Sequence, residues 1–185
     1  MSATKRILVV AATEPELCGH QGLLCGVGPV EAASATARAL ALDRPDAVLH
    51  VGLAGGLGLE PGTIVAGTEA VYVDISAAIP VVSRVEPDRD LLAAVREALP
   101  DAHRLPIGTS AAVGGLRGSE SHIVPVEAME GFAVLRACEL ALVPAVEVRV
   151  VSNEIGELDR ARWQIARALE ALAGALPQLL SAVGD

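Results

Sequence analysis

VEAMEGFAVLRACELALVPAVEVRVVSN, residues 126–153, joins a helix-forming stretch to an apolar strand that ends on a polar pair. We predict that the helix begins near Ala128, which places Glu130 in its first turn, and that Ser152 and Asn153 mark the end of the strand. In an open α/β sheet, ligands bind beside the carboxyl ends of the strands and the neighbouring helix ends. This stretch therefore indicates both the fold class and the place of a site.

Each of these polar residues also has an ordinary structural explanation. A solvated acid that interacts favourably with the helix dipole accounts for Glu130, and a simple turn accounts for Ser152 and Asn153. A binding role requires that the rest of the chain supply partners for them.

The composition of the 185-residue chain fits one domain, 1–185, because 52% hydrophobic and 20% charged residues suffice for a well-buried sheet covered by helices. The net charge of −9 opposes nucleic-acid binding, which needs clustered Lys and Arg. The sequence has no apolar run long enough for a membrane helix and no signal-peptide pattern, so we expect a cytoplasmic protein without a membrane partner.

Cysteine and histidine spacing predicts no metal site, and we expect no cofactor. Cys18, Cys25 and Cys138 lack a CxxC pattern and are expected to be core thiols. The histidines are scattered without the spacing of metal ligands: His20, His50, His103 and His122. Aromatic residues make up only 2% of the chain, so a pocket for a flat ligand must use aliphatic side chains or side chains lent by a partner subunit.

Strands and helices alternate along the rest of the chain. We predict short strands at 5–12 and 22–27 and one or two strands within 61–74. The segment 46–58 is predicted to be a strand that runs into a loop with four glycines, and a strand from 103 leads into a second glycine turn. The predicted helices open at Pro29, cover 88–99, and run from Arg160 to the end. This order predicts an α/β fold with a mainly parallel, twisted, mixed central sheet flanked by helices.

Two glycine segments have competing explanations. GVGPVE at 26–31 matches only the first two glycines of a GxGxxG nucleotide fingerprint, so a tight turn from strand to helix explains it better. The loop that contains Ala54, Gly55 and Gly56 would let backbone amides approach a ligand closely, although an ordinary turn fits equally well.

Six segments, in order along the chain, resemble the purine nucleoside phosphorylase superfamily: ATEPEL (12–17), GVGPVEAA (26–33), VGLAGGL (51–57), GTIVAGTEAVYVD (62–74), VEAMEGFAV (126–134) and VRVVSN (148–153). The acidic first loop and the MEGFA segment are similar to the nucleosidase branch, which includes methylthioadenosine/S-adenosylhomocysteine nucleosidase. The tail GELDRARWQIARAL (156–169) is similar to that of futalosine hydrolase in menaquinone biosynthesis. The resemblance implies a nucleoside phosphorylase-like fold and hydrolysis of the N-glycosidic bond of a small-molecule purine nucleoside.

The resemblance also assigns roles to residues. Glu16 matches the glutamate that activates water, with Glu14 as the alternative. Glu130 matches the glutamate that accepts hydrogen bonds from the ribose hydroxyls, and Asn153 occupies the position of the purine-facing acid or amide. The expected substrate contacts are the glycine segment and the residues around the polar positions: Ala54, Gly55, Gly56, Met129, Glu130 and Ser152.

The chain departs from its relatives in two ways that bear on the reaction. It is shorter than expected for the family after Asp74 and between Gly115 and Val126, and the second region is where relatives contribute backbone contacts to the base. Its first loop lacks the Gly-Asp and arginine pattern of phosphate-using relatives, which favours water as the nucleophile.

Three functions stay open on these grounds: a futalosine nucleosidase, an adenosine-type nucleosidase or phosphorylase, and a non-catalytic nucleoside binder. The presence of both Glu16 and Glu130 argues against the binder. The amide of Asn153 favours a 6-oxopurine, because its two N–H donors suit the acceptors N7 and O6. Adenine instead pairs with a protonated aspartate. The alternative is that Asn153 has only a structural role at the end of the strand. By resemblance we expect a homodimer or a higher homo-oligomer.

Overall fold

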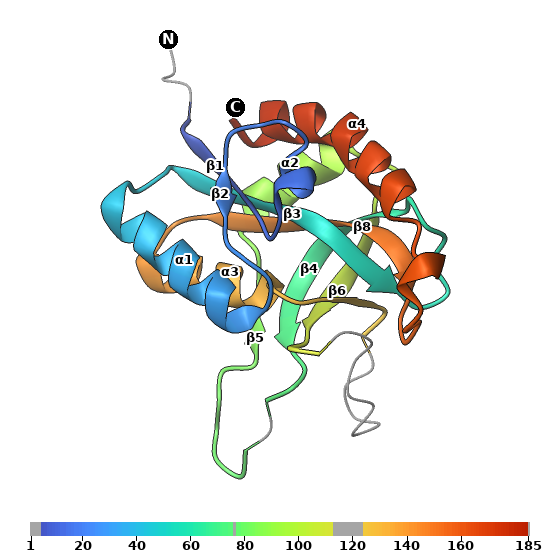
Figure 1. Ribbon diagram of the computed structural model, residues 1–185. Coiled ribbons are helices and arrows are strands. Elements are labelled where there is room, and N and C mark those ends of the chain that lie inside the picture. The colour runs from blue at the N-terminus through green and yellow to red at the C-terminus, as the bar shows by residue number, and fades with distance from the viewer. Residues whose placement is uncertain (1–4, 76, 113–123, 185) are drawn as a thin grey trace.

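The computed structural model describes residues 5–75, 77–112 and 124–184. Within these ranges, one eight-stranded sheet carries helices on both sides (Figure 1). The elements in chain order are β1 (Ile7–Ala11), η1 (Glu14–Leu17), β2 (Leu23–Leu24), α1 (Pro29–Leu42), β3 (Ala47–Gly56), β4 (Ile64–Tyr72), β5 (Arg84–Val85), α2 (Arg89–Ala98), β6 (His103–Thr109), β7 (Val126–Ala128), α3 (Gly131–Ala141), β8 (Ala145–Glu154), η3 (Arg160–Arg162) and α4 (Ile165–Gly184).

The sheet is mixed, as the sequence predicts. Its strand order is β2-β1-β3-β7-β6-β4-β5, and β8 pairs with both β3 and β4. Strand β8 is parallel to β3 and antiparallel to β4, while β7 is antiparallel to the end of β3 and parallel to β6. Because β4 also pairs with β6, the strands β3, β8, β4, β6 and β7 form a closed ring.

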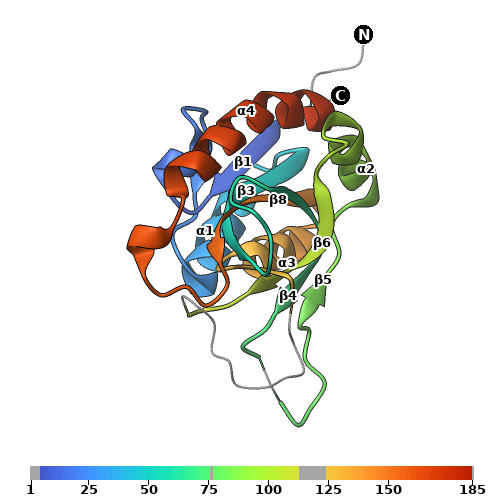
Figure 2. The same cartoon turned by 90° about the vertical axis from the view of Figure 1, so that its right-hand side faces the viewer.

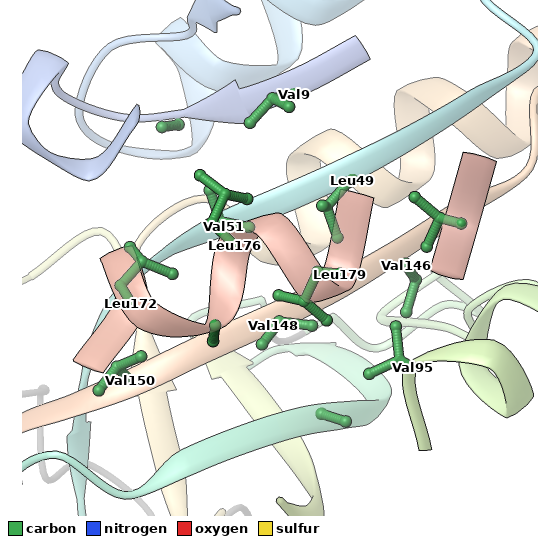
Figure 3. Packing of buried hydrophobic residues seen from close by; sticks show 14 of the residues in the cluster. Val9, Leu49, Val51, Val95, Val146, Val148, Val150, Leu172, Leu176 and Leu179 are labelled. Atoms are coloured by element: carbon green, nitrogen blue, oxygen red, sulfur yellow. The ribbon is translucent and has the colours of Figure 1, made fainter. Parts of the chain in front are cut away.

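Two apolar cores lie on opposite sides of the sheet. Helices α2 and α4 cover one side, and α1 and α3 cover the other (Figures 1 and 2). Figure 3 shows Leu172, Leu176 and Leu179 of α4 packed over Val148 and Val150 of β8, all with no exposed surface. Because both faces are covered, residues on both sides of the central strands are mostly apolar, which explains the near-continuous hydrophobic runs in the sequence.

The predicted helices α1 and α2 are confirmed, with start signals that the sequence shows. Pro29 is the first residue of α1 and follows Gly28, whose φ of 93° favours glycine. Asp88 caps α2 by accepting hydrogen bonds from the amides of Asp90 and Leu91, each at 3.0 Å. None of the described helices combines the length and the hydropathy that crossing a membrane requires.

The predicted helix is present, but its predicted start near Ala128 is wrong. Val126–Ala128 form β7, and α3 begins at Gly131 with Glu130 as its N-cap residue. Val126 and Glu127 pair with Gly56 and Gly55 at the end of β3. This pairing is a contact between distant segments, and it overrides the helical pattern of the local sequence.

The predicted glycine loop is mostly strand. Strand β3 continues to Gly56, so Gly52 and Gly55 lie within the sheet and only Gly58 lies beyond it. A Cβ on Gly52 would collide with the guanidinium of Arg149 and lie 2.8 Å from Oε1 of Glu16, so close packing requires glycine there.

The other boundaries differ by smaller amounts. Strand β8 continues to Glu154, so Ser152 and Asn153 belong to the strand and form no turn. Helix α4 begins at Ile165 rather than at Arg160, because the short η3 precedes it. The segment 61–74 contains one strand, β4. The glycine turn predicted after β6 falls outside the described residues.

Candidate active site

A cavity of about 400 Å³ opens where β3, β7 and β8 end, beside η1 and the start of α3. Most of the residues that the sequence predicts as site residues line it: Glu16, Ala54, Gly55, Met129, Glu130, Ser152 and Asn153. Gly56 does not line the cavity, because its α-carbon faces Leu59 and Val151, which a Cβ would approach to 2.9 and 3.0 Å. The fold thus brings together four segments that are far apart in the sequence.

Glu16 is held in one orientation by three hydrogen-bond donors. Its Oε2 accepts from the amide and the hydroxyl of Thr13, at 2.9 and 2.7 Å, and its Oε1 accepts from the amide of Leu53 at 2.9 Å. Only 7% of the residue is exposed. Glu14, the alternative base, is exposed and does not line the cavity. A fixed carboxylate at the cavity wall is the geometry that a general base needs.

Glu130 is a buried acid, so the explanation as a solvated helix-start residue is wrong. It is 4% exposed and makes no side-chain cap to its own helix. Instead, Oε1 accepts a hydrogen bond from the amide of Gly28 at 3.1 Å, and Oε2 lies 3.4 Å from Nη2 of Arg149. Its partners therefore come from the β2–α1 turn and from β8, and its carboxylate faces the cavity.

Arg149 is a buried cation of the site that our sequence analysis misses. Its Nε donates to Glu147 at 2.8 Å, its Nη2 donates to Nε2 of His50 at 2.5 Å, and its Nη1 lies 3.4 Å from the carbonyl of Leu53. Burial alone would lower the pKa of Arg149, but the carboxylates of Glu147, Glu130 and Glu16 raise it above its usual value. The guanidinium thus stays charged behind both cavity carboxylates.

His50 is neutral in this network. Burial, followed by the charge of Arg149, lowers its pKa well below the usual value. Its Nδ1 lies 3.0 Å from the carbonyl of Val10, which accepts only, so the proton is on Nδ1 and the lone pair of Nε2 accepts from Arg149. The sequence signal for this network is the pair of charged residues, Glu147 and Arg149, two positions apart in the otherwise apolar run 145–151 of β8.

Asn153 lines the cavity, and one N–H of its amide has no partner among the described residues. The hydroxyl of Ser152 donates to Oδ1 of Asn153 at 2.7 Å, and Nδ2 donates to the carbonyl of Glu154 at 3.0 Å. The second N–H of the amide is left for a ligand. Ser152 is buried and also lies 3.3 Å from the carbonyl of Ala54, so it links β8 to β3 at this point.

The rest of the cavity wall is largely apolar and includes the aromatic ring of Trp163. Trp163 lines the cavity together with Ile155, Ile165 and Leu169. The guanidinium of Arg160, 5.4 Å from the centre of the Trp163 ring, lines it as well. In the described part of the chain, no three His, Cys, Asp or Glu side chains are arranged to hold a metal ion.

The arrangement suits cleavage of a bond to a sugar. Glu16 can accept a proton, Glu130 can accept hydrogen bonds from hydroxyls, and Asn153 can donate to a leaving group. Arg149 stabilises the negative charge of both acids without occupying the cavity itself.

Comparison with known proteins gives the family. The pattern of the Phosphorylase superfamily matches residues 17–183. Futalosine hydrolase of Streptomyces coelicolor is 36% identical, over 87% of this chain and 78% of that protein. The 5'-methylthioadenosine/S-adenosylhomocysteine nucleosidase of Chromohalobacter salexigens is 28% identical, over 73% of this chain and 67% of that protein. The solved futalosine hydrolase of Helicobacter pylori has the same fold, with a TM-score of 0.85 and 16% identity over 96% of this chain and 98% of that one. The chain therefore belongs to the phosphorylase superfamily and, within it, to the nucleosidase branch that contains futalosine hydrolase.

Proposed function

We propose that this chain is a nucleosidase that hydrolyses the N-glycosidic bond of futalosine and releases hypoxanthine in menaquinone biosynthesis. The observation that carries the proposal is the placement of Glu16 and Glu130, two buried carboxylates from distant segments, in the wall of one cavity. The similarity to the Streptomyces coelicolor futalosine hydrolase over most of the chain supports the choice of substrate.

In the proposed reaction, Glu16 takes a proton from a water molecule whose oxygen bonds to C1′ of the ribose. The bond from C1′ to the purine N9 breaks, and its electron pair leaves with the base through an oxocarbenium-like transition state. The purine anion then takes up a proton from solvent, and Glu16 releases its proton to solvent. Glu130 accepts hydrogen bonds from the ribose hydroxyls, and Met129 packs against the sugar. The free N–H of Asn153 stabilises the departing purine, which gains negative charge as it leaves.

An adenosine-type nucleosidase is the second candidate, and the similarity to the Chromohalobacter salexigens enzyme favours it. The amide of Asn153 favours the first candidate. One N–H of this amide remains for a base, and its Oδ1 already accepts from Ser152. The N–H can donate to N7 of either base, but only a 6-oxopurine adds a second acceptor, O6, on the same edge, whereas adenine places its amino group there.

The experiment that tests the proposal is release of free base from futalosine, inosine and methylthioadenosine, each with and without phosphate. We expect hypoxanthine from futalosine at a rate that phosphate does not change. The double variant Glu16→Gln/Glu130→Gln is the matched control, since contaminating enzymes would be unaffected by it. Faster release from methylthioadenosine, or a requirement for phosphate, would contradict the assignment.

We further propose that the enzyme works as a homodimer or a higher homo-oligomer. Three apolar residues between β2 and the start of α1 are solvent-exposed in the single chain: Leu24, Val27 and Val30, at 48%, 56% and 75%. Val27 also lines the cavity, so a second copy that covers this surface would help to close it. A monomer with full activity in light scattering would contradict this assembly.

We also propose that the enzyme is cytoplasmic. Cys18, Cys25 and Cys138 are all free thiols, which is the usual state of cysteine in a reducing compartment. Fractionation of cells that express the tagged chain would test this location, and recovery outside the cytoplasm would contradict it.

A further inference from the structure

The buried ion pair of Glu147 and Arg149 lacks half of the geometry that such pairs usually have. Arginine and a carboxylate commonly form two parallel hydrogen bonds, one to each carboxylate oxygen. Here Nε of Arg149 donates to Oε1 of Glu147 at 2.8 Å, but Oε2 of Glu147 is buried and has no hydrogen-bond partner among the described residues. A buried oxygen without a partner is uncommon, because its lost hydration is not replaced. The structure must therefore contain a reason why Nη2 does not complete the pair.

His50 of β3 supplies an acceptor that competes for Nη2. Its Nε2 accepts from Nη2 of Arg149, and its Nδ1–H is fixed on the carbonyl of Val10 at 3.0 Å. Because the N–H groups of a guanidinium form a rigid planar fork, a contact of one N–H with His50 sets the direction of the others. The second contact of Nη2 is Oε2 of Glu130, at 3.4 Å. His50 thus keeps Nη2 beside Glu130 and away from the unpaired oxygen of Glu147.

The position of the guanidinium affects both acids of the cavity. A Cβ on Gly52 would collide with Nη1 of Arg149 and lie 2.8 Å from Oε1 of Glu16, so these two atoms lie against the same glycine. The charges of Glu130 and Glu16 both raise the pKa of Arg149. By the same interaction, the cation favours the ionised forms of the two acids. A guanidinium that moved toward Glu147 would leave two buried carboxylates with less compensation.

We propose that His50 is a positioning residue that keeps Arg149 shared between Glu147 and the two carboxylates of the cavity. It does so by occupying the N–H group that would otherwise form the second hydrogen bond to Glu147. The inference rests on the proposed function, because it takes Glu16 as the base and Glu130 as the ribose contact. The unpaired oxygen of Glu147 is the structural sign of this division.

His50→Leu removes the competing acceptor without changing a charge, since His50 is neutral. We expect Nη2 to turn to Oε2 of Glu147 and so to withdraw the cation from Glu130. Carboxylates that lose a nearby cation stay protonated to higher pH. The acid side of the pH profile of kcat/KM should therefore move to higher pH, and kcat/KM at neutral pH should fall roughly tenfold to a hundredfold.

The pH profile reports on a defined set of groups. The ionisable side chains around the guanidinium are Glu16 of η1, Cys25 after β2, His50 of β3, Glu130 at the start of α3 and Glu147 of β8. Burial, followed by the charge of Glu130, raises the pKa of Cys25 to about 12, and the lowered pKa of His50 keeps it neutral. The three carboxylates therefore set the acid side of the profile.

Conservative variants at the same position separate the hydrogen bond from general damage. The amide oxygen of His50→Gln can reach the place of Nε2, so this variant should recover most of the rate and of the shift. If His50→Leu does not fold in a thermal melt, His50→Asn replaces it, because its shorter side chain keeps a donor for Val10 but does not reach Arg149. His103→Leu is the matched control, since His103 is exposed at the start of β6 and does not line the cavity. It should leave the profile unchanged.

A second background tests whether Glu147 captures the cation. Glu147→Gln keeps an oxygen for Nε but puts an amide nitrogen in place of the second oxygen, so it cannot form the second bond. In this background, His50→Leu should move the acid side of the profile far less than in the wild-type background. An equal shift in both backgrounds, or a loss of kcat/KM without a shift, would overturn the role of His50.

Crystal structures of the variants give a measurement that needs no turnover. In His50→Leu, Nη2 should lie about 2.9 Å from Oε2 of Glu147 and farther from Glu130 than the present 3.4 Å. In His50→Gln, both contacts should stay as they are. A guanidinium that kept its place in His50→Leu would overturn the inference, whatever the rate. If the wild-type protein failed to cleave futalosine, the proposed function would be refuted, and these distances would still judge His50.

Discussion

The carboxylate of Glu147 occupies the space in which a side chain on Gly131 would stand. A Cβ on Gly131 would overlap both carboxylate oxygens. Glu147 is 1% exposed, and it forms an ion pair with Arg149 at 2.8 Å. Gly131 is the first residue of α3, directly after Glu130. The glycine of the MEGFA segment is therefore required by an acid in the following strand, and through that acid it affects the guanidinium behind the cavity.

Gly131→Ala should destabilise the protein by about 3 kcal/mol, because the new methyl group displaces a buried, paired carboxylate. The free energy of unfolding, measured in urea, checks this value. Gly174→Ala is the control: Gly174 lies in α4 with open space around its α-carbon, so alanine should be neutral or stabilise by up to about 1 kcal/mol. In the double variant Gly131→Ala/Glu147→Val, the two effects should be strongly non-additive. Additive losses would show that the two residues are not coupled.

Glu16→Gln should lower kcat by roughly a hundredfold to ten-thousandfold, because the amide cannot take a proton from water. The variant should stay folded, since an amide oxygen can still accept from Thr13 or from Leu53. Steady-state hydrolysis of futalosine, with circular dichroism as the folding check, gives the measurement. Retention of the full rate would transfer the role to another group.

Glu130→Gln should affect both kcat and KM, since Glu130 contacts the ribose in the bound state and in the transition state. The loss of negative charge also leaves Arg149 with one fewer partner, so we expect a drop in stability of about 1–3 kcal/mol. The surface variant Glu69→Gln, which breaks the exposed pair with Arg84, should change neither rate nor KM. An unchanged KM for Glu130→Gln would contradict the ribose contact.

Asn153→Asp should reduce cleavage of the 6-oxopurine nucleoside and shift relative activity toward its 6-amino analogue by roughly ten to a hundredfold. The physical reason is the change in donors and acceptors: a protonated aspartic acid donates to N7 and accepts from the amino group of a 6-aminopurine, whereas it meets O6 of a 6-oxopurine with an acceptor. The ratio of kcat/KM for the two nucleosides is the quantity to compare. A ratio unchanged from wild type would exclude Asn153 as a base contact.

His50 should make the protein less stable in mild acid. In the unfolded chain, histidine binds a proton below a pH of about 6.5, whereas the lowered pKa of His50 keeps it neutral in the fold. The unfolded state therefore binds more protons, and the free energy of unfolding falls as the pH drops below that value, by up to about 1.4 kcal/mol per pH unit. His50→Gln, whose amide oxygen can accept from Arg149, should flatten this slope between pH 6.5 and 5.5. An identical slope in both proteins would contradict the neutral assignment.

Much of the fold can be predicted from local signals. Continuous apolar runs identify the central strands, Pro29 marks the start of α1, and the polar residues at the end of β8 mark the site. These features depend on neighbours in the sequence, so the periodicity of apolar residues or a single residue type is enough to find them.

The parts that the sequence analysis misses depend on distant partners. Three residues, Val126–Ala128, become a strand because β3 and β6 lie on either side of them. Arg149 contacts Glu147, His50 and Glu130; spacing along the strand signals only the contact to Glu147, and those to His50 and Glu130 depend on the fold. The burial of the Arg149 guanidinium cannot be predicted from composition, because it depends on how the strands assemble into the sheet.

Strand β3 serves the chemistry and the choice of base through separate residues. The amide of Leu53 holds Glu16, whereas Gly55 is paired with Asn153, the residue proposed to contact the base. A lineage can therefore replace Asn153 and acquire a different base without moving the group that activates water. Selection on substrate range would act on the end of β8 and could leave the Thr13–Glu16 turn as it is.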